Sequence, residues 1–239
     1  MALGTELRSI AGLLPVTMVD WEGKLASLLF LRGCNLRCPY CHNPELVLAA
    51  GIGRLKWDEV VGQLREKKGW IDGVVITGGE PAINSELEEI VERVRAEGFG
   101  VKLDTNGTRP DVLIKLLAEG ALDYVALDIK APFEQYEKVT RVPGMAGPVR
   151  ESIAVLVASG IDHEFRTTVV PGFFEPSELI DVARELGEAG GRRYFIQQFN
   201  PDNVLDEELS AVRPFPSGLL EDAAEACSEF LPTKARGRL

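Results

Sequence analysis

Residues 31–46 read LRGCNLRCPYCHNPEL and place three cysteines, Cys34, Cys38 and Cys41, within eight residues. Thiolates are the usual ligands of iron–sulfur clusters, and short spacings let one loop wrap one cluster. Pro39 disfavours a regular helix here, so the segment is predicted to be a loop. Three cysteine ligands leave one iron of a four-iron cluster with an open coordination position, as catalytic metal sites have. The stretch therefore predicts a [4Fe–4S] cluster that serves as a redox centre.

Two other interpretations of the cysteines stay open at this point. The three thiols and His42 would also suit a structural zinc ion, and the cluster of thiols would also arise by coincidence in a buried loop. The fourth cysteine, Cys227, lies in a predicted helix beside Ala223 and Ala224 and is interpreted as a small core residue. We expect His42 to form a hydrogen bond within the loop and not to bind metal.

Outside this loop, short apolar strands alternate with amphipathic helices. The predicted strands are residues 26–31, 73–77, 101–104, 124–129, 163–170 and 194–199, and the predicted helices are residues 57–68, 85–97, 110–118, 149–158, 176–188 and 219–230. A hairpin or lead-in turn around Glu22 and Gly23 is expected before the first strand. Six strands that alternate with helices indicate a mostly parallel sheet, and six units are too few for an eight-unit barrel.

The fold class expected from this order is α/β, a partial (β/α)6 barrel of parallel strands that is open on one side. A flat doubly wound sheet is the alternative. We expect one domain over residues 1–239, with a core at about 17–201 and a C-terminal helix at about 219–230. Residues 131–148, which contain three prolines, are interpreted as a crossover loop.

The charge balance narrows the possible partners. The net charge is −11 and the isoelectric point about 4.8, and no basic patch of the kind typical of nucleic-acid binders is visible. Lys234, Arg236 and Arg238 form a small basic tail, which we interpret as a solvated, frayed C-terminus. No targeting segment and no run of 18 apolar residues is visible, so we expect a cytoplasmic protein that binds no membrane.

Polar residues lie at or near the ends of the predicted strands. Cys34 follows the first strand and Glu80 the second; Asp104, Thr105 and Asn106 close the third; Asp128 and Lys130 close the fourth; Arg166 and Thr168 lie in the fifth; Gln197 and Gln198 lie in the sixth. The carboxyl ends of parallel strands converge on one mouth, where ligands bind. Such a ring of groups suits a polar ligand with amino, carboxylate and ribose groups. Because strand side chains alternate, one of the two glutamines is expected to face away from this mouth.

The cysteine loop, with Tyr40 directly before the third cysteine, resembles that of the radical S-adenosylmethionine (SAM) superfamily. Three segments, DWEGK at residues 20–24, RGCNLRCPYCHNPEL at 32–46 and TGGEP at 77–81, are similar to those of glycyl-radical enzyme activating enzymes. The similarity extends over about residues 12–201. It is greatest to anaerobic ribonucleoside-triphosphate reductase activating proteins and includes pyruvate formate-lyase activating enzymes.

This resemblance implies roles for the first group of site residues. Gly78 and Gly79 would let the backbone approach the ligand closely, since glycine has no side-chain bulk. Glu80 would face the methionine ammonium, although a plain strand-to-helix turn would use the same residues. Tyr40 would contact adenine or, alternatively, pack within the loop.

The remaining site residues follow from the same resemblance. Asp104 and Thr105, followed by Asn106, would lie near the methionyl and ribose groups, and Asp128 and Lys130 resemble a pair in the formate-lyase activators. Asp104, Thr105 and Asp128 would hold a monovalent cation beside the cofactor carboxylate, or the acids would instead form a structural network with Lys130. Arg166 resembles the fifth-strand arginine of the family, with a buried ion pair as the alternative.

The implied activity is reductive cleavage of SAM and formation of a glycyl radical on a partner enzyme, with an anaerobic ribonucleoside-triphosphate reductase as the expected partner. Flavodoxin or ferredoxin is the expected electron donor, and no side chain is needed as a catalytic acid or base. The chain has no cysteines for additional clusters, which separates it from the larger activators. Two alternatives stay open: a radical SAM enzyme acting on a small molecule, as in deazapurine synthesis, and a non-catalytic iron–sulfur or zinc protein.

Overall fold

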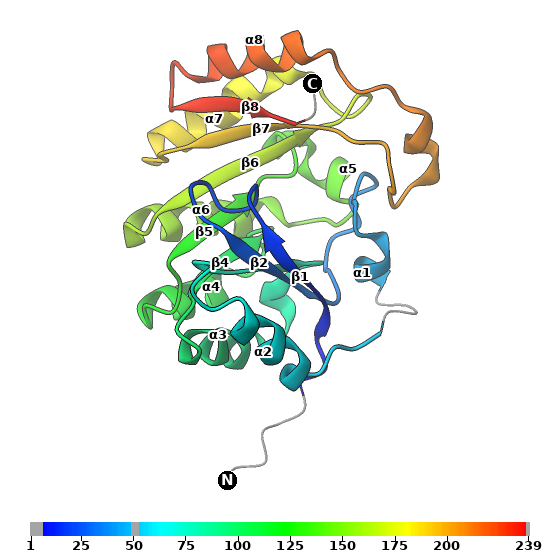
Figure 1. Ribbon diagram of the computed structural model, residues 1–239. Helices are drawn as coiled ribbons and strands as arrows, with labels where there is room; N and C mark the ends of the chain where they lie inside the picture. The colour runs from blue at the N-terminus through cyan, green and yellow to red at the C-terminus, as the bar shows by residue number, and fades with distance from the viewer. Residues whose placement is uncertain (1–6, 49–52, 238–239) are drawn as a thin grey trace. The chain divides into compact units, whose positions relative to one another are not determined.

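The computed structural model describes residues 7–48 and 53–237 (Figure 1). The chain forms two compact units. Unit 1 contains Met1–Asn35, Glu45–Asp104 and Lys115–Tyr124, and unit 2 contains Leu36–Pro44, Thr105–Ile114 and Val125–Leu239. The expectation of a single domain stays a prediction.

Unit 1 is an α/β unit built on a sheet in the order β1-β2-β3-β4. Strand β2 pairs antiparallel with β1 and parallel with β3, which in turn pairs parallel with β4. Because β2 and β3 are covered on both sides, they are almost continuously apolar, as buried parallel strands are. Its elements are β1 (Ile10–Thr17), β2 (Ala26–Leu31), α1 (Pro44–Leu48, most of which lies in this unit), α2 (Trp57–Glu66), β3 (Gly73–Gly78), η1 (Pro81–Ile83), α3 (Leu87–Ala96) and β4 (Gly100–Thr105).

The helices of unit 1 follow from their sequence pattern. In α3 the apolar side chains Leu87, Ile90, Val91 and Val94 recur at helical spacing, and all four are buried. Acidic residues occupy the first turn and arginines the last turn, the arrangement that the helix dipole favours. Gly98, with a φ of +86°, follows the helix in the left-handed conformation that glycine adopts most readily.

Unit 2 contains four parallel strands in the order β5-β6-β7-β8. Helices α7 and α8 lie beside β7 and β8 (Figure 1). Its elements are β5 (Tyr124–Asp128), η2 (Phe133–Gln135), α5 (Tyr136–Thr140), α6 (Ala146–Ser159), β6 (His163–Val169), η3 (Pro176–Glu178), α7 (Leu179–Glu188), β7 (Tyr194–Gln198), η4 (Glu207–Ala211), α8 (Ser217–Cys227) and β8 (Thr233–Arg236). Helix α4 (Pro110–Ala118) has residues in both units.

The α/β class is confirmed, with β2 to β7 at the six predicted strand positions. The described residues of each unit form an open sheet and not a closed barrel. Helix α4 has the predicted bounds, whereas α6 starts three residues before its predicted start and α8 ends three residues before its predicted end. No helix in the described part of the chain is long and apolar enough to cross a membrane.

Two strands, β1 and β8, and two α-helices, α1 and α5, were not predicted. Strand β1 begins at Ile10, seven residues before the hairpin or lead-in turn expected at residues 17–24. Its sequence, IAGLLPVT, contains Gly12 and Pro15, which disfavour a strand prediction. The loop expected at residues 131–148 contains α5 and the start of α6. These elements are short or begin in segments rich in glycine and proline, so local periodicity does not reveal them.

The prediction of a frayed basic tail is wrong for the described residues. Lys234 and Arg236 lie in β8, which pairs with β7, and Arg236 forms an ion pair with Glu164 at 3.2 Å. The partner of Arg236 is 72 residues away in sequence, which explains why no local pattern indicated it. Arg238 lies outside the described residues.

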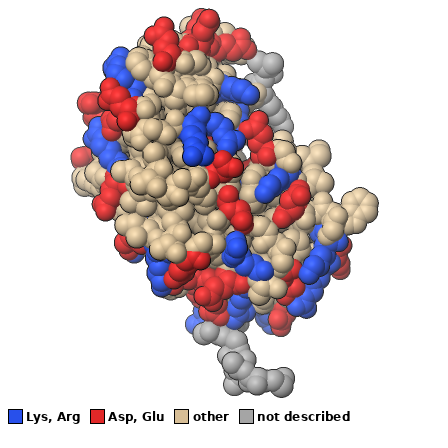
Figure 2. Space-filling model, turned by 90° about the vertical axis from the view of Figure 1, so that its left-hand side faces the viewer, with Lys and Arg blue, Asp and Glu red and all other residues tan. Residues whose placement is uncertain are grey.

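The surface carries charges of both signs. On the face shown in Figure 2, basic and acidic side chains are interspersed. Several exposed pairs of the chain are in contact, such as Arg150 with Glu185 and Lys115 with Glu88, both at 2.6 Å. Exposed pairs of this kind contribute little to stability. The packing of the apolar strands is therefore the main source of stability within each unit.

Truncation of a buried strand residue tests this packing. Leu29 in β2 is fully buried. We expect Leu29→Ala to destabilise unit 1 by about 2–5 kcal/mol through lost transfer energy and the cavity left behind. The urea midpoint, followed by circular dichroism, measures the change. Leu14→Ala in β1, where the side chain is 45% exposed, is the matched control, and equal midpoints for the two variants would contradict the assignment of Leu29 to the core.

Candidate cluster and cofactor site

The three cysteines of the predicted cluster site lie on one loop, and none of them forms a disulfide. Cys38 is buried, whereas Cys34 and Cys41 are partly exposed. Cys34 belongs to unit 1 and the other two to unit 2. No three His, Cys, Asp or Glu side chains among the described residues are grouped, as they stand, in a metal-holding arrangement. The donor chemistry fits an iron–sulfur cluster, since three thiols free of disulfides are available on a short wrapping segment.

Backbone hydrogen bonds fix the loop at both of its ends. In unit 1, Gly33 N donates to Leu46 O at 2.8 Å and Gly33 O accepts from Glu80 N at 2.7 Å. Gly33 has a φ of +83°, a conformation that favours glycine. In unit 2, Arg37 N donates to Thr140 O and Cys41 N donates to Cys38 O. The chain's own backbone therefore holds the segment that carries the thiols.

The glycine pair that ends β3 lies against the residues that precede Cys34. A Cβ atom on Gly79 would lie 2.0 Å from Gly33 O, and one on Gly78 would lie 2.2 Å from Leu31 O. Glycine is therefore required at both positions because backbone atoms of the chain itself leave no room for a Cβ atom. Contact of these glycines with SAM stays a prediction.

Glu80 is buried and caps the short helix η1. Its Oε1 accepts a hydrogen bond from Ala82 N at 2.9 Å, which satisfies one of the free N–H groups at a helix start. This geometry fits the interpretation of residues 78–80 as a plain strand-to-helix turn. The role of Glu80 toward the methionine ammonium stays a prediction.

The three residues at the end of β4 are buried and engaged locally. Lys102 Nζ lies 3.5 Å from Asp104 Oδ1. Thr105 Oγ1 accepts a hydrogen bond from Gly107 N at 3.1 Å, and Asn106 Oδ1 accepts one from Thr108 N at 3.0 Å. Thr105 and Asn106 therefore shape the turn after the strand, and their contact with the cofactor stays a prediction.

In unit 2, the predicted residues Asp128, Lys130 and Arg166 are brought together. Arg166 Nε donates to Asp128 Oδ1 at 2.6 Å, and Lys130 Nζ donates to Asp128 Oδ2 at 3.0 Å. Burial opposes ionisation of Asp128, but the two cations outweigh this effect and lower the pKa of its carboxyl group. Burial would lower the pKa of Lys130, but Asp128 and Cys38 outweigh it and raise that pKa.

Sequence reasoning missed two members of this network. Arg236 approaches Glu164 at 3.2 Å, and Glu164 lies 3.8 Å from Arg166. Glu164 was available from the sequence, because it lies two residues before Arg166 on a strand and so shares its face. Two cations, Arg166 and Lys130, already pair with Asp128, so a monovalent metal cation at this carboxylate would compete with them; the cation site stays a prediction.

Tyr40 lies beside the Asp128 network through its hydroxyl group. It donates a hydrogen bond to Lys130 O at 3.0 Å, and its ring contacts Phe173 edge to face at 6.5 Å. Burial and the nearby Cys38 raise the pKa of Tyr40 well above its usual value, so the hydroxyl stays protonated and acts as a donor. Its contact with adenine stays a prediction.

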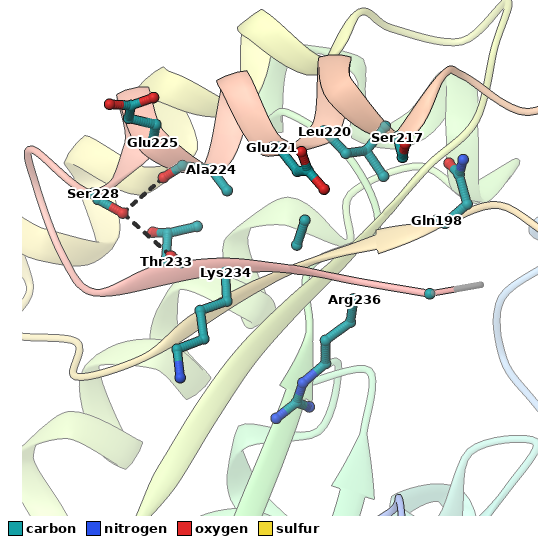
Figure 3. Close-up of a pocket in the computed structure, with 12 residues that line it drawn as sticks. Gln198, Ser217, Leu220, Glu221, Ala224, Glu225, Ser228, Thr233, Lys234 and Arg236 are labelled. Carbon is teal, nitrogen blue, oxygen red and sulfur yellow. Dashed lines mark hydrogen bonds between the residues drawn. The ribbon is translucent and has the colours of Figure 1, made fainter. Parts of the chain in front are cut away.

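The structure also separates the two glutamines of β7. Gln198 Nε2 donates to Phe215 O at 2.5 Å, and Gln198 lines a pocket of about 480 Å³ between α8 and β8 (Figure 3). Lys234 and Arg236 point away from α8 in the same view, and Arg236 stacks over Phe195. Since side chains alternate along β7, Gln197 shares the face of Phe195 and of the Asp128 network. Gln198 therefore faces away from the Asp128 network.

The other cysteine and the two histidines have structural surroundings. Cys227 is fully buried in α8, and burial raises the pKa of its thiol to about 11, which confirms its interpretation as a core residue. The ring of His42 stacks on Phe199 at 6.4 Å, and burial lowers the pKa of His42. His163 Nδ1 contacts Ile161 O at 2.8 Å.

A family model described as the Radical SAM superfamily matches residues 28–186. A putative glycyl-radical enzyme activating enzyme of Methanocaldococcus jannaschii is 31% identical over 87% of this chain and 86% of its own length. A putative activating enzyme of the same kind from Haemophilus influenzae is 26% identical over 92% of this chain and 86% of its own length. The chain therefore belongs to the radical SAM superfamily.

The protein is a radical SAM enzyme, and its similarity over most of its length is to activating enzymes of glycyl-radical enzymes. Membership implies a [4Fe–4S] cluster and SAM as cofactors, and it overturns the alternative of a non-catalytic metal protein. Among solved structures, SuiB of Streptococcus suis matches with a TM-score of 0.69 at 12% identity over 86% of this chain. The chain spans about half the length of SuiB, 47%, and the match supports the partial-barrel fold alone.

A single methyl group tests the approach of Gly79 to the cysteine loop. We expect Gly79→Ala to displace Gly33 and hence Cys34, because the added Cβ cannot be placed without moving backbone. Iron and sulfide bound per chain after anaerobic reconstitution should fall below half of the wild-type amounts. Gly62→Ala in α2 is the control, since a Cβ there meets nothing within 4 Å. Full cluster content in Gly79→Ala would refute the constraint.

The charge network predicts an acid-sensitive contribution to stability. The pKa of Asp128 is lower in the folded state than the value of about 3.9 in unfolded chains, so its contribution is complete above that pH and is lost as the pH falls toward the folded pKa. We expect Asp128→Asn to cost about 2–3 kcal/mol at neutral pH, less than a fully buried pair would, because 24% of the side chain is exposed.

Urea unfolding of the apoprotein at several pH values measures this difference. The difference in the free energy of unfolding between wild type and Asp128→Asn should be constant around neutral pH and should decrease below about pH 4. Asp181→Asn on α7, whose ion pair with Arg184 is exposed, is the control and should leave the midpoint almost unchanged. A gap that stays constant down to pH 2 would show that the charge of Asp128 does not stabilise the fold.

Proposed function

We propose that this protein activates a glycyl-radical enzyme and that its partner is an anaerobic ribonucleoside-triphosphate reductase. The similarity to the putative activating enzyme of M. jannaschii, which extends over most of both chains, carries the proposal. A pyruvate formate-lyase-activating enzyme of Clostridium pasteurianum, 29% identical over 68% of this chain, supports the same class. The ribonucleotide reductase partner rests on the resemblance of the cysteine loop and of its flanking segments.

In this proposal Cys34, Cys38 and Cys41 hold the cluster. When bound, the cluster and SAM would supply the radical chemistry: one-electron reductive cleavage of SAM to methionine and a 5′-deoxyadenosyl group that would remove a hydrogen atom from a glycine Cα of the partner and leave as 5′-deoxyadenosine. Flavodoxin or ferredoxin would deliver the electron. The protein is proposed to act in the cytoplasm.

The chain's own residues bind and orient. Gly78 ends β3 and is followed by Gly79 and Glu80. Asp104 and Thr105 end β4 and are followed by Asn106. We propose that both groups contact SAM. In unit 2, Arg166 and Lys130 are held by Asp128, so their positive charges are fixed in place before a ligand binds. Fixed charges of this kind stabilise a ligand carboxylate without reorganisation. No proton transfer by a side chain is required.

A second candidate is a radical SAM enzyme that acts on a small molecule. The 7-carboxy-7-deazaguanine synthase of Aquifex aeolicus is 40% identical over 106 residues, which are 43% of this chain and 47% of that protein. The identity is higher than the 31% to the activating enzyme of M. jannaschii, but it covers only half as much of this chain. A purine-like product formed without any partner protein would favour this candidate.

Cleavage of SAM is the first test of the proposal. We expect the anaerobically reconstituted protein, reduced with dithionite, to form 5′-deoxyadenosine and methionine, and Cys38→Ala to lose this activity by at least 100-fold because a ligand of the cluster is missing. Cys227→Ala removes a cysteine that is remote from the loop in sequence and should retain both cluster and activity. Equal activity in wild type and Cys38→Ala would overturn the assignment.

The partner is tested in the same reaction. With an anaerobic ribonucleoside-triphosphate reductase present, electron paramagnetic resonance should detect a glycyl radical, and the signal should be absent with pyruvate formate-lyase. A glycyl radical that forms on pyruvate formate-lyase alone would overturn the proposed partner and identify the lyase as the partner instead.

A further inference from the structure

Three arginines gather around one open pocket of unit 1, close to the cysteine loop. The pocket has a volume of about 380 Å³ and is lined by Arg8, Ser9, Arg32, Arg54, Asn84, Ser85 and Glu86. Arg8 comes from the segment before β1, Arg32 follows β2 directly, and Arg54 precedes α2. Three segments that are distant in sequence thus bring positive charge to one place.

The lining is basic although the chain as a whole is strongly acidic. Three guanidinium groups and one carboxylate, that of Glu86, give the lining a net positive charge, whereas the chain has a net charge of −11. Glu86 Oε2 accepts hydrogen bonds from Arg8 N, Ser9 N and Ser9 Oγ, at 2.7 to 2.8 Å. These bonds tie the segment before β1 to the start of α3 and thereby hold Arg8 beside the pocket.

The pocket adjoins the segment that leads to the first cysteine. Arg32 is two residues before Cys34, so their Cα atoms are at most ~7.6 Å apart. Asn84, which also lines the pocket, donates through Nδ2 to Arg32 O at 3.1 Å and to Glu80 O at 3.3 Å. A protein bound at these arginines would approach Cys34 closely, and electron transfer is fast only over short distances.

We propose that Arg8, Arg32 and Arg54 form the docking site for the acidic electron-carrier protein that reduces the cluster. This inference rests on the proposed function and adds to it the surface that the donor uses. Arginine is the residue best suited to carboxylates, because its planar guanidinium group binds them in bidentate fashion. Local positive charge also offsets the repulsion that two acidic proteins would otherwise experience, and it orients the donor toward Cys34.

The openness of the pocket favours a protein over a small anion. Small-molecule sites are concave and enclose most of their ligand, whereas this pocket is open to solvent at Arg8 and Arg54, which are exposed. The exposed arginines at the rim of the pocket resemble the charges at the rim of a transient protein interface. Such charges affect the association rate more than the lifetime of the complex.

The test compares two reductants on the same reconstituted enzyme. SAM cleavage is driven either by dithionite, a small ion that needs no docking surface, or by reduced flavodoxin, the acidic carrier used as the probe. The variant is the double substitution Arg8→Gln/Arg54→Gln. Arg32 is left intact because it is two residues from Cys34. Arg192→Gln, an exposed arginine of unit 2 whose guanidinium lies 3.8 Å from Asp162, is the matched control.

At low ionic strength we expect the flavodoxin-driven rate, at subsaturating flavodoxin, to fall about tenfold in the double variant. The dithionite-driven rate and the iron content should stay within twofold of wild type. The deficit should shrink at about 0.5 M salt, where surface charges are screened. Arg54→Glu should lose more activity than Arg54→Gln, since it reverses the charge and does not merely remove it.

Flavodoxin-driven rates that are equal in the double variant and in Arg192→Gln would overturn the docking site. So would a parallel loss with dithionite, which would show that the arginines support the cluster loop and not the donor. Binding of inorganic phosphate that the double variant loses, with an unchanged flavodoxin-driven rate, would assign the pocket to small anions instead. Failure of wild-type protein to cleave SAM with dithionite would refute the proposed function itself and is thus distinguishable from all of these outcomes.

Discussion

The close approach of Gly79 to Gly33 is the constraint on which the cysteine loop depends. Parallel pairing aligns Leu31 at the end of β2 with Gly78 at the end of β3, so the two chains leave the sheet side by side. The amide of Glu80 then bonds to Gly33 O, one residue before the first cysteine. Any side chain larger than hydrogen at Gly79 would occupy the space of that carbonyl. The sheet register thereby determines where Cys34 is placed.

Unit 2 depends on a different interaction, a series of alternating charges carried by β5, β6 and β8. Asp128 accepts from Arg166 and Lys130, and Glu164 lies between Arg166 and Arg236. Each buried charge has an opposite charge beside it, which offsets the cost of desolvation. Such a network adds little net stability relative to an apolar core, but it keeps cationic side chains in defined positions. Defined cationic positions are what a site for a carboxylate-bearing ligand requires.

The sequence indicated those features whose chemistry is local. Three cysteines at short spacing, the amphipathic helix around Ile90 and the apolar strand at residues 26–31 each have a pattern that can be read over a few residues. The bounds of β2 and α4 agree with the prediction because the first is a continuous apolar run and the second begins at a proline. Asp128 ends β5 and Lys130 follows it, as predicted, and Arg166 lies within β6 directly beside Asp128 in the parallel register.

The features that were missed depend on distant partners. Strand β8 is four residues long and carries two cations, so only its pairing with β7 makes it a strand. Arg236 belongs to the charge network through Glu164, and no local signal connects them. The cap that Glu80 provides for η1 and the arginines around Glu86 are likewise consequences of how segments meet. Local patterns specify the elements, whereas the surroundings of polar side chains follow from the tertiary structure.

The pairing of Arg236 with Glu164 also has a consequence for synthesis on the ribosome. Glu164 is translated 72 residues before the arginine that accompanies it, and its side chain is only 2% exposed in the folded unit. Until residue 236 has left the exit tunnel, the nascent unit must keep this carboxylate hydrated, protonated or paired with Arg166 alone. The pairing of Glu164 with Arg236 therefore forms only after β8 has been made and has joined β7.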